Sequence, residues 1–486
     1  MLLSRRVSSE GKNRHRHQIQ GEENMRKAIR GLAEKLHFGM EKVMPDSFIF
    51  AIILTFIVFI MAMIVVNAGP LEIVAAWHKG FWSYLLFSMQ MTILLIFGYS
   101  MAITKPGTYV LDRLTGLAKT PAGAVAWVSF LASMLCLINW GLGLAGSIFL
   151  CLGTARRVKG VHWPLLVASA YIGCMATTAY SVSITEPLLL NQAGWGWPAA
   201  VIPTVEKAIG QKLAPMGFEK TIYAPASIVA FIVSPLLCAL LCYLMHPVPA
   251  KTKTISEEAL KGLTVMADFE SRITRGTSIA DRLNWSRTLW VLISLLTVVA
   301  AVLWFRGKSF LQLDLNMFNF LFILLALIFH GNIPRFVESV KRATEASYGI
   351  ILQFPFYAGI FGIMAFTGLL QAIANWFGTL ASPFLYPLVV MISAGIINIF
   401  IPSSGGIWMV QGPPLIMAAA QLGVPFNRVA MAFTAGEVIT NAIQPFWALP
   451  LLGATKTEMR NIMGYCIVST AALFIVVALI YLYLPM

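Results

Sequence analysis

Two short polar strings interrupt long apolar stretches of the sequence, and both have the chemistry to hold a small anion. Asn139-Trp140-Gly141-Leu142-Gly143 lies within stretch 122–151, and Pro402-Ser403-Ser404-Gly405-Gly406 lies within stretch 384–422. Non-helical backbone at membrane depth has to line a cavity or be buried in protein, and unpaired amides at a helix start favour negative charge. The predicted substrate-binding residues at the two tips are Asn139, Trp140, Gly141, Gly143, Asn398, Ser403, Ser404, Gly405 and Gly406.

The helix expected after each string carries polar residues in its middle. The first reads Ala176-Thr177-Thr178-Ala179-Tyr180-Ser181, and the second reads Glu437-Val438-Ile439-Thr440-Asn441-Ala442-Ile443-Gln444-Pro445. Pro445 removes a backbone hydrogen bond, so a regular helix cannot continue through it. Thr177, Thr178, Asn441 and Gln444 therefore join the predicted substrate site, although Ser and Thr in membrane helices also bond their own backbone or a neighbouring helix.

Glu437 is the single most informative residue. An acid inside the bilayer costs a few kcal/mol on insertion scales and is rare without a role. We predict that Glu437 couples transport to an ion, either by carrying a proton or by helping to hold Na⁺, and a sodium site near Asn139 and Asn398 stays open. A protonated or paired structural acid is the alternative. The broken segments contain no Arg or Lys, so amides and hydroxyls would hold a carboxylate substrate.

Other motifs are absent or in the wrong context. Gly141-x-Gly143-x-x-Gly146 matches GxGxxG, but it follows no strand and lacks the later acid, so it predicts no dinucleotide site. No Walker, GxSxG or HExxH string occurs, and the six cysteines lie in or beside apolar segments without a CxxC pair. We therefore predict no catalytic residues, no cofactor and no further metal site, and the chain is not expected to be an enzyme.

Composition indicates the elements that must position these residues. The chain has 486 residues, 58% hydrophobic and 12% charged, with a mean hydropathy of +0.77. A soluble domain is about 25% charged, so this chain is predicted to be an all-α polytopic membrane protein in contact with the lipid bilayer. Its net charge of +14 comes from a tail and loops between apolar runs, which is typical of cytoplasmic loops and predicts no nucleic-acid partner.

Loop charges predict how the chain crosses the membrane. A spanning helix needs about 20 apolar residues. Candidate spans are 47–66, 82–103, 162–186, 223–246, 288–305, 315–331, 346–366, 429–452 and 460–484. Loops 104–121 and 152–161 both read as cytoplasmic, so stretch 122–151 is predicted to be a re-entrant hairpin, and stretch 384–422 is predicted to be a second one entering from outside. Glu186 is counted with the outer loop 187–222.

The two halves of the chain match each other. At an offset of 264 residues, Ser83-Tyr84 aligns with Ser347-Tyr348 and Ile96-Phe97-Gly98 aligns with Ile360-Phe361-Gly362. The span at 288–305 separates the halves, so the second is predicted to be inverted. Two inverted repeats, each with a re-entrant hairpin and an interrupted helix, are typical of secondary transporters.

These observations give a division of the chain. The predicted parts are a disordered basic extension (1–24), an amphipathic interfacial helix (25–46), a first transmembrane repeat (47–246), a cytoplasmic loop (247–287), a connecting transmembrane helix and loop (288–314), and a second, inverted repeat (315–486). The basic N-terminal segment predicts a cytoplasmic N-terminus.

Several polar and aromatic strings coincide in order with those of one family. They are Cys136-Leu137-Ile138-Asn139-Trp140-Gly141-Leu142-Gly143, Gln353-Phe354-Pro355-Phe356-Tyr357-Ala358-Gly359-Ile360, Pro402-Ser403-Ser404-Gly405-Gly406, Val410-Gln411-Gly412-Pro413, Gln444-Pro445-Phe446-Trp447-Ala448-Leu449-Pro450 and Met463-Gly464-Tyr465-Cys466. Over residues 40–484 the chain resembles the short-chain fatty acid transporters (AtoE-like permeases). The resemblance implies uptake of monocarboxylates such as acetoacetate or butyrate across a bacterial inner membrane. It also implies kinship with a wider group of ion transporters that have paired hairpins and elevator motion and often couple to Na⁺ or H⁺.

The resulting prediction is a secondary active transporter, a symporter of a short-chain carboxylate with H⁺ or Na⁺. A transporter of another small carboxylate, such as a dicarboxylate or an amino-acid derivative, is the nearest alternative. A membrane-embedded enzyme and a channel are the alternatives of another class. A homodimer is left open.

Overall fold

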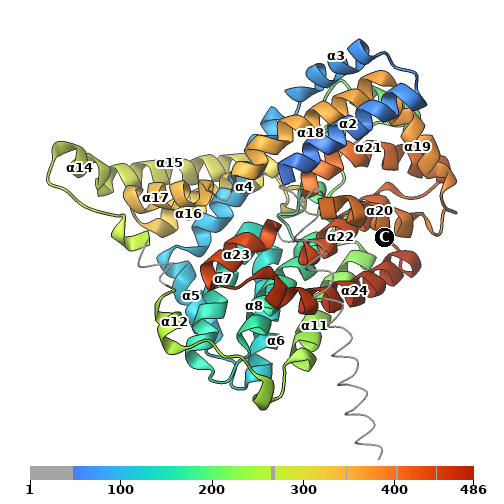
Figure 1. Ribbon diagram of the computed structural model, residues 1–486. Helices are drawn as coiled ribbons and strands as arrows, with labels where there is room; N and C mark the ends of the chain where they lie inside the picture. Colours follow the sequence, from blue (N-terminus) through green and yellow to red (C-terminus); the bar gives the residue numbers. More distant parts are fainter. Residues whose placement is uncertain (1–46, 264–268, 346, 401–402, 445) are drawn as a thin grey trace, which may run out of the picture.

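Helices formed by the predicted apolar stretches make up the structure (Figure 1). This computed structural model describes residues 47–263, 269–345, 347–400, 403–444 and 446–486. Within the described residues, seven helices are long and apolar enough to cross a membrane. The predicted extension 1–24 and interfacial helix 25–46 lie outside the described residues, as do Pro402 and Pro445. The all-α membrane fold expected from composition is confirmed.

The helices can be divided into two series, joined by a connecting group. The first series is α2 (Ser47–Val65), α3 (Pro70–Phe81), α4 (Leu85–Ala102), α5 (Lys105–Thr115), α6 (Pro121–Ile138), α7 (Trp140–Arg157), α8 (Trp163–Thr177), the 3₁₀ turn η1 (Thr178–Tyr180), α9 (Thr185–Leu190), α10 (Ile202–Ile209) and α11 (Pro225–Met245). The connecting group is α12 (Glu257–Lys261), α14 (Ile279–Asn284) and α15 (Arg287–Phe305). The second series is α16 (Leu315–His330), α17 (Ile333–Thr344), α18 (Tyr348–Thr367), α19 (Leu369–Thr379), α20 (Tyr386–Phe400), α21 (Ser404–Leu422), α22 (Phe426–Thr440), the 3₁₀ turn η6 (Asn441–Ile443), α23 (Leu449–Thr455) and α24 (Met459–Tyr483).

Several segments between the predicted spans are also helical, and four of them have eleven or twelve residues. These are α3, α5, α17 and α19, each shorter than a membrane span. Most of them begin with proline in the first turn, where its missing N–H costs nothing. The stretches 104–121, 332–345 and 367–383 are therefore not plain loops.

Each predicted hairpin is a pair of helices folded back on each other. In the first, α6 and α7 join at Asn139, and Gly143 lies directly against Cys136 of the opposing helix. In the second, Gln411 Nε2 donates to Ser393 Oγ at 2.9 Å, and the Tyr386 hydroxyl donates to the Leu415 carbonyl at 2.9 Å. Both hairpins are present, whereas their turning back within the bilayer stays a prediction.

The chain breaks at each tip because a capping side chain replaces helical bonding. Asn139 has extended backbone (φ −157°, ψ 126°), and its Oδ1 accepts from Leu142 N at 3.0 Å. Ser403 likewise accepts from Gly406 N through Oγ at 3.3 Å. Asn and Ser are among the preferred N-cap residues, since their side-chain oxygens satisfy amides that have no helical partner. The helices after the hairpins are interrupted as predicted, at η1 and at η6.

The two series pack against each other reciprocally. Helix α18 lies against α2 and α3, and α4 lies against α16 and α17. Gly80 of α3 and Gly362 of α18 allow their backbones to touch, since a Cβ on either would collide with the other helix. Small residues at helix contacts are the usual way in which membrane helices approach closely. In Figure 1, α14 to α17 extend to one side and α2, α3 and α18 form an upper group.

Helix α15 exposes most of its apolar side chains. Its exposed residues include Leu292, Leu295, Leu296, Val299, Val302 and Leu303. An exposed apolar surface of this extent needs a lipid or protein neighbour. The protein is therefore a multi-pass membrane protein.

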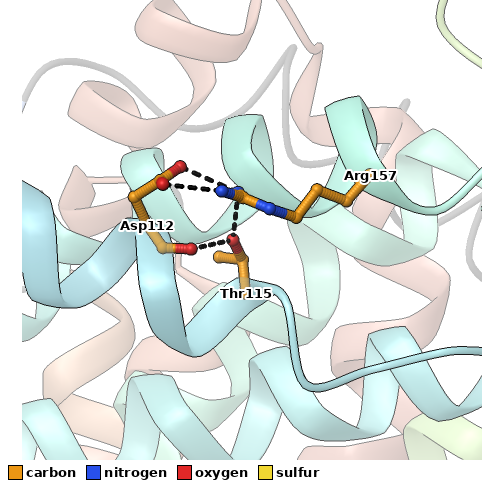
Figure 2. A network of polar contacts seen from close by, with 3 residues as sticks. All are labelled: Asp112, Thr115 and Arg157. Carbon is orange, nitrogen blue, oxygen red and sulfur yellow. Dashed lines mark hydrogen bonds and ion pairs between the residues drawn. The ribbon is translucent and has the colours of Figure 1, made fainter.

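An ion pair joins α5 to α7 (Figure 2). Arg157 donates from Nη1 to Asp112 Oδ1 at 2.8 Å and from Nη2 to Asp112 Oδ2 at 2.6 Å. Arg157 Nη1 also donates to Thr115 Oγ1 at 2.7 Å, and that hydroxyl donates to the Asp112 carbonyl. Hydrogen bonding from Arg157 lowers the pKa of Asp112 below its ordinary value. The side chains of Asp112 and Arg157 are 54% and 37% exposed, so water screens the attraction between them and the ion pair contributes little stability.

Asp112→Asn should lower the free energy of unfolding at neutral pH by about 0.2–1 kcal/mol, the range for exposed ion pairs. Because the folded-state pKa is lowered, this stabilisation exists above the ordinary carboxyl pKa and disappears as the pH falls through the lowered value. Melting temperatures of wild type and variant in detergent, at neutral and strongly acidic pH, measure it. An equal difference between the two proteins at both pH values would contradict the assignment.

Candidate functional site

One cavity brings together the second hairpin tip, both interrupted helices and helix α18. Its lining residues are Met91, Trp140, Leu144, Met175, Thr178, Ile184, Thr185, Gly349, Ile350, Gln353, Phe354, Ser403, Ser404, Gly405, Glu437, Val438, Asn441, Phe446 and Trp447. The hydroxyls, amides and one carboxyl group are set among methionine, isoleucine and aromatic side chains. A small molecule with one polar end and a short apolar part suits such a lining.

The start of α21 supplies the hydroxyls of the second tip. Ser403 caps the helix, and Ser404 Oγ donates to Glu186 Oε1 at 2.6 Å. Gly405 has no side chain, and a Cβ there would meet Phe87 and Thr185. Its small size therefore allows the start of α21 to pack closely against these two side chains. The predicted residues Ser403, Ser404 and Gly405 all line the cavity.

The first tip contributes its tryptophan and not its asparagine. Trp140 lines the cavity, and its backbone N donates to Ser183 Oγ at 2.9 Å. Asn139 is wholly buried against α4, where a Cβ on Gly98 would collide with its Oδ1. Gly141 packs against the backbone of α4, and Gly143 packs against Cys136. These glycines allow close helix packing and do not line the cavity.

The interrupted helices contribute Thr178, Glu437 and Asn441. Thr178 Oγ1 donates to the Cys174 carbonyl at 2.5 Å, and Asn441 Nδ2 donates to Glu437 Oε1 at 3.3 Å. Glu437 is wholly buried, and its Oε2 has no hydrogen-bond partner among the described residues. A buried carboxyl oxygen without a partner beside a cavity is a position where a proton, a cation or a substrate group can bind.

Four other predicted residues lie around the cavity and not on its wall. Thr177 Oγ1 donates to the Ser133 carbonyl at 3.2 Å, so it bonds backbone. Gln444 Oε1 accepts from Phe446 N at 2.9 Å, and Gly406 lies against Tyr357. Asn398 supports the wall from behind. Asn139 and Asn398 contact different helices, α4 and α22, and are not brought together.

Asn398 anchors the end of α22. Its Nδ2 lies 2.9 Å from the Glu437 carbonyl, 3.0 Å from Thr440 Oγ1 and 2.9 Å from Asn441 Oδ1. Asn398 is wholly buried, and its contacts hold the two cavity residues of this helix, Glu437 and Asn441.

Asn398→Leu keeps a similar volume but leaves those acceptors without their donor. An unsatisfied buried group costs about 1–3 kcal/mol, so we expect a lower melting temperature together with weaker carboxylate binding. Ligand-dependent thermal shifts measure both effects. Asn375→Leu, on the exposed part of α19, is the matched control. Wild-type stability and affinity in Asn398→Leu would show that the anchor is dispensable.

Sequence reasoning missed several residues that line this cavity or contact its wall. The most important is Glu186, which was counted with the outer loop but lies wholly buried in α9 with its carboxyl bonded to Ser404. Thr185 and Trp447 also line the cavity, as does Gln353, whose Oε1 accepts from the Tyr357 hydroxyl at 2.8 Å. The signal available for Glu186 was an acid directly after an apolar run, which hydropathy alone places at the membrane boundary.

Charge and metal-binding groups around the site are few. No Arg or Lys is among the lining residues. No group of three or more His, Cys, Asp and Glu side chains is arranged to hold a metal ion in the part of the chain that the structure describes. Binding of an anion here would depend on hydroxyls, amides and helix N-termini, and on neutralising the buried acids.

Comparisons with known proteins give the same picture. The family model described as "Short chain fatty acid transporter" matches residues 28–484. The chain is 33% identical over 440 residues to a protein of Haemophilus influenzae named "Putative short-chain fatty acid transporter", covering 90% of this chain and 96% of that protein. It is 34% identical over 431 residues to an Escherichia coli protein of the same name, covering 89% and 94%.

Two solved structures share the fold. The YdaH transporter of Alcanivorax borkumensis superposes with a TM-score of 0.56 at 13% identity, covering 90% of this chain and 98% of that one. MtrF of Neisseria gonorrhoeae, described with a class of antimetabolite efflux pumps, superposes with a TM-score of 0.58 at 14% identity, covering 91% and 95%. At such identities the likeness concerns the fold alone.

Proposed function

Since the chain belongs to the short-chain fatty acid transporter family, we propose that it carries short-chain monocarboxylates such as butyrate and acetoacetate across the inner membrane, coupled to H⁺ or Na⁺. The family and the names of its relatives support transport and no enzymatic activity. The substrate, the ion and the membrane are our assignments.

The observation that carries the proposal is the mixed lining of the cavity. Ser403 and Asn441 offer hydroxyl and amide donors at one wall, and Trp140 and Trp447 offer an apolar wall. A carboxylate accepts hydrogen bonds from such donors, and a short alkyl chain gains about 0.8 kcal/mol for each buried CH₂. The start of α21 adds amides that favour negative charge.

Coupling follows from the acids beside this wall. Glu437 lines the cavity, and Glu186 bonds its Ser404. An anion placed beside two ionised acids without Arg or Lys would be repelled. A cation that enters with the substrate removes the repulsion, and its obligatory presence makes the protein a symporter.

Two inverted repeats would allow the substrate site to be exposed alternately to the two sides of the membrane. The same order of helices in both series and the reciprocal packing of α18 and α4 support two repeats of opposite orientation. With a cytoplasmic N-terminus, the two hairpin tips would approach the site from opposite membrane faces. Substrate sites of transporters with such repeats lie near the bilayer midplane at the repeat interface.

Uptake by purified protein in proteoliposomes tests the function. We expect labelled butyrate to accumulate against its gradient when a proton or sodium gradient is imposed, with propionate and acetoacetate competing. Stronger competition by dicarboxylates or amino-acid derivatives would change the substrate class. Equilibration without accumulation would indicate a channel, and chemical conversion of the acid would indicate an enzyme.

A further inference from the structure

Two acids from distant parts of the chain meet at the cavity. Glu186 comes from α9 in the first series and Glu437 from α22 in the second. Both are wholly buried, α9 packs against α22, and Ser404, which bonds Glu186, lines the same cavity as Glu437. Ser404 Oγ donates to Glu186 Oε1 at 2.6 Å, and Asn441 Nδ2 donates to Glu437 Oε1 at 3.3 Å. Each acid therefore has one bonded oxygen.

The second oxygen of each acid has no hydrogen-bond partner. Neither Glu186 Oε2 nor Glu437 Oε2 has a donor among the described residues, and both atoms are shielded from solvent. Two ionised carboxylates side by side in a buried site repel each other, and each also loses its hydration. A bound proton removes both costs, because it cancels one charge and turns one bare oxygen into an O–H donor.

No fixed cation in the part of the chain that the structure describes neutralises the pair. On α22 itself, Arg428 lies nine residues before Glu437, about 14 Å along the helix, and its guanidinium donates to the carbonyls of Tyr481 and Leu484. On α16, which packs against α9, Asp314 caps the first turn through Met317 N, and His330 at the far end bonds Ser100. The pair thus has to obtain its counter-charge from outside the protein.

On α24, which packs against α22, Arg460 lies exposed at the start of the helix and pairs with Glu458. The other ionisable side chains on the surrounding helices are phenols and thiols, which are uncharged at neutral pH. They include Tyr84, Tyr171, Tyr180, Tyr357, Tyr386, Tyr465, Tyr481, Tyr483, Cys174 and Cys466. Tyr84, Tyr171 and Tyr386 donate to backbone carbonyls, and Tyr357 donates to Gln353. Among the described residues around the cavity, Glu186 and Glu437 are therefore the acids that can exchange a proton with a substrate or with water.

We propose that Glu186 and Glu437 act as one unit that binds the transported proton, and that this proton must be bound before the substrate carboxylate can occupy the cavity. The inference rests on the proposed function and names its coupling site. A proton from the water on one side forms an O–H bond on one carboxyl group, and that bond breaks when the proton is released on the other side. No oxidation or reduction takes place.

The arrangement explains why one site can bind both an anion and a proton. With both acids ionised, a carboxylate entering the cavity meets two like charges. Each bound proton removes one of them and adds an O–H donor, and charge-assisted bonds from such donors to a carboxylate are about twice as strong as neutral ones. Proton binding and carboxylate binding therefore strengthen each other by the same factor.

The first test uses wild-type protein in sodium-free choline buffer. If one proton is taken up with each carboxylate, the dissociation constant for butyrate should rise about tenfold for each pH unit above neutrality. Butyrate itself stays ionised there, because a free carboxyl group titrates near pH 4. Butyrate added to detergent-solubilised protein in weak buffer should raise the pH of the solution, and this rise measures proton uptake by the protein directly. Binding that is independent of pH and requires Na⁺ would overturn the proposal.

The second test changes the pair. Glu186→Gln and Glu437→Gln, singly and together, keep the shape of each side chain but cannot exchange a proton. The double variant should show no proton uptake on butyrate addition and no pH dependence of butyrate exchange, whatever its rate. Glu219→Gln, in the exposed segment before α11, is the matched control and should keep the wild-type slope. A wild-type slope in the double variant would overturn the assignment to these acids.

These experiments distinguish failure of the proposed proton site from failure of the proposed transport function. Butyrate transport without proton movement overturns the paired-acid site and leaves the transport function in place. Absence of transport for every carboxylate tried overturns the proposed function, and the coupling site with it.

Discussion

Gly405→Leu is expected to abolish butyrate uptake while the helix bundle stays folded. Gly405 lines the cavity, and a side chain at this position would meet Phe87 and Thr185. Those atoms are the ends of side chains, so the bundle can adjust, but Thr185 lines the cavity and its displacement takes space from the substrate. Overpacking costs about 1–3 kcal/mol, and about 3 kcal/mol taken from substrate binding corresponds to a loss in affinity of about a hundredfold.

Uptake rates in proteoliposomes and melting temperatures in detergent measure this prediction together. Gly453→Leu in α23 is the matched control, because no atom lies within 4 Å of a Cβ at that position. The control should transport at the wild-type rate. Wild-type uptake by Gly405→Leu would mean that substrate does not pass this part of the cavity.

Trp447→Ala should shift the preference of the transporter toward longer acids. Trp447 and Trp140 both line the cavity, with ring centroids 5.2 Å apart in an edge-to-face contact. Removing the indole side chain enlarges the apolar part of the cavity, and the additional methylene groups of a longer acid can fill this volume. One methylene group in an apolar pocket is worth about 1–3 kcal/mol, or about 10–200-fold in discrimination. We expect hexanoate to gain at least about tenfold over butyrate.

Competition against labelled butyrate by propionate, butyrate, hexanoate and octanoate measures the shift. Trp376→Ala provides the same substitution on an exposed part of α19 and should leave the order of preference unchanged. If Trp447→Ala keeps the wild-type order of preference among these acids, Trp447 does not determine the chain length of the substrate.

Helix positions could be predicted well because apolar runs of the right length leave few alternatives in a membrane. The predicted spans 47–66, 288–305 and 460–484 differ from α2, α15 and α24 by at most one residue at each end. The shorter helices α3, α5, α17 and α19 were missed, since hydropathy selects segments that cross a membrane and these are too short to do so.

The candidate site could be predicted only in part. Ser403, Ser404, Gly405, Glu437 and Asn441 were found because polar residues inside apolar stretches are costly and thus informative. Asn139 and Gly143 have the same signal, but their side of the hairpin packs against α4 and α6. Which face of a broken helix turns to the cavity depends on tertiary packing, and a sequence pattern does not contain it.

Glu186 is a residue of the site that the sequence pattern did not identify. The acid follows directly on an apolar run, so charge counting assigns it to the outer loop. In the structure the chain bends after η1 and continues as α9, which carries Glu186 back to the start of α21. The partner that identifies it, Ser404, is far away in sequence and becomes visible only in the fold.

A diffraction or cryo-electron microscopy map of the protein with bound 4-bromobutyrate tests the central claim most directly. We predict the carboxylate at Ser403 and Asn441 and the bromine against Trp140 and Trp447, identified by its anomalous signal in crystals. Bromine located outside this cavity, with the cavity unfilled at saturating ligand, would contradict the account.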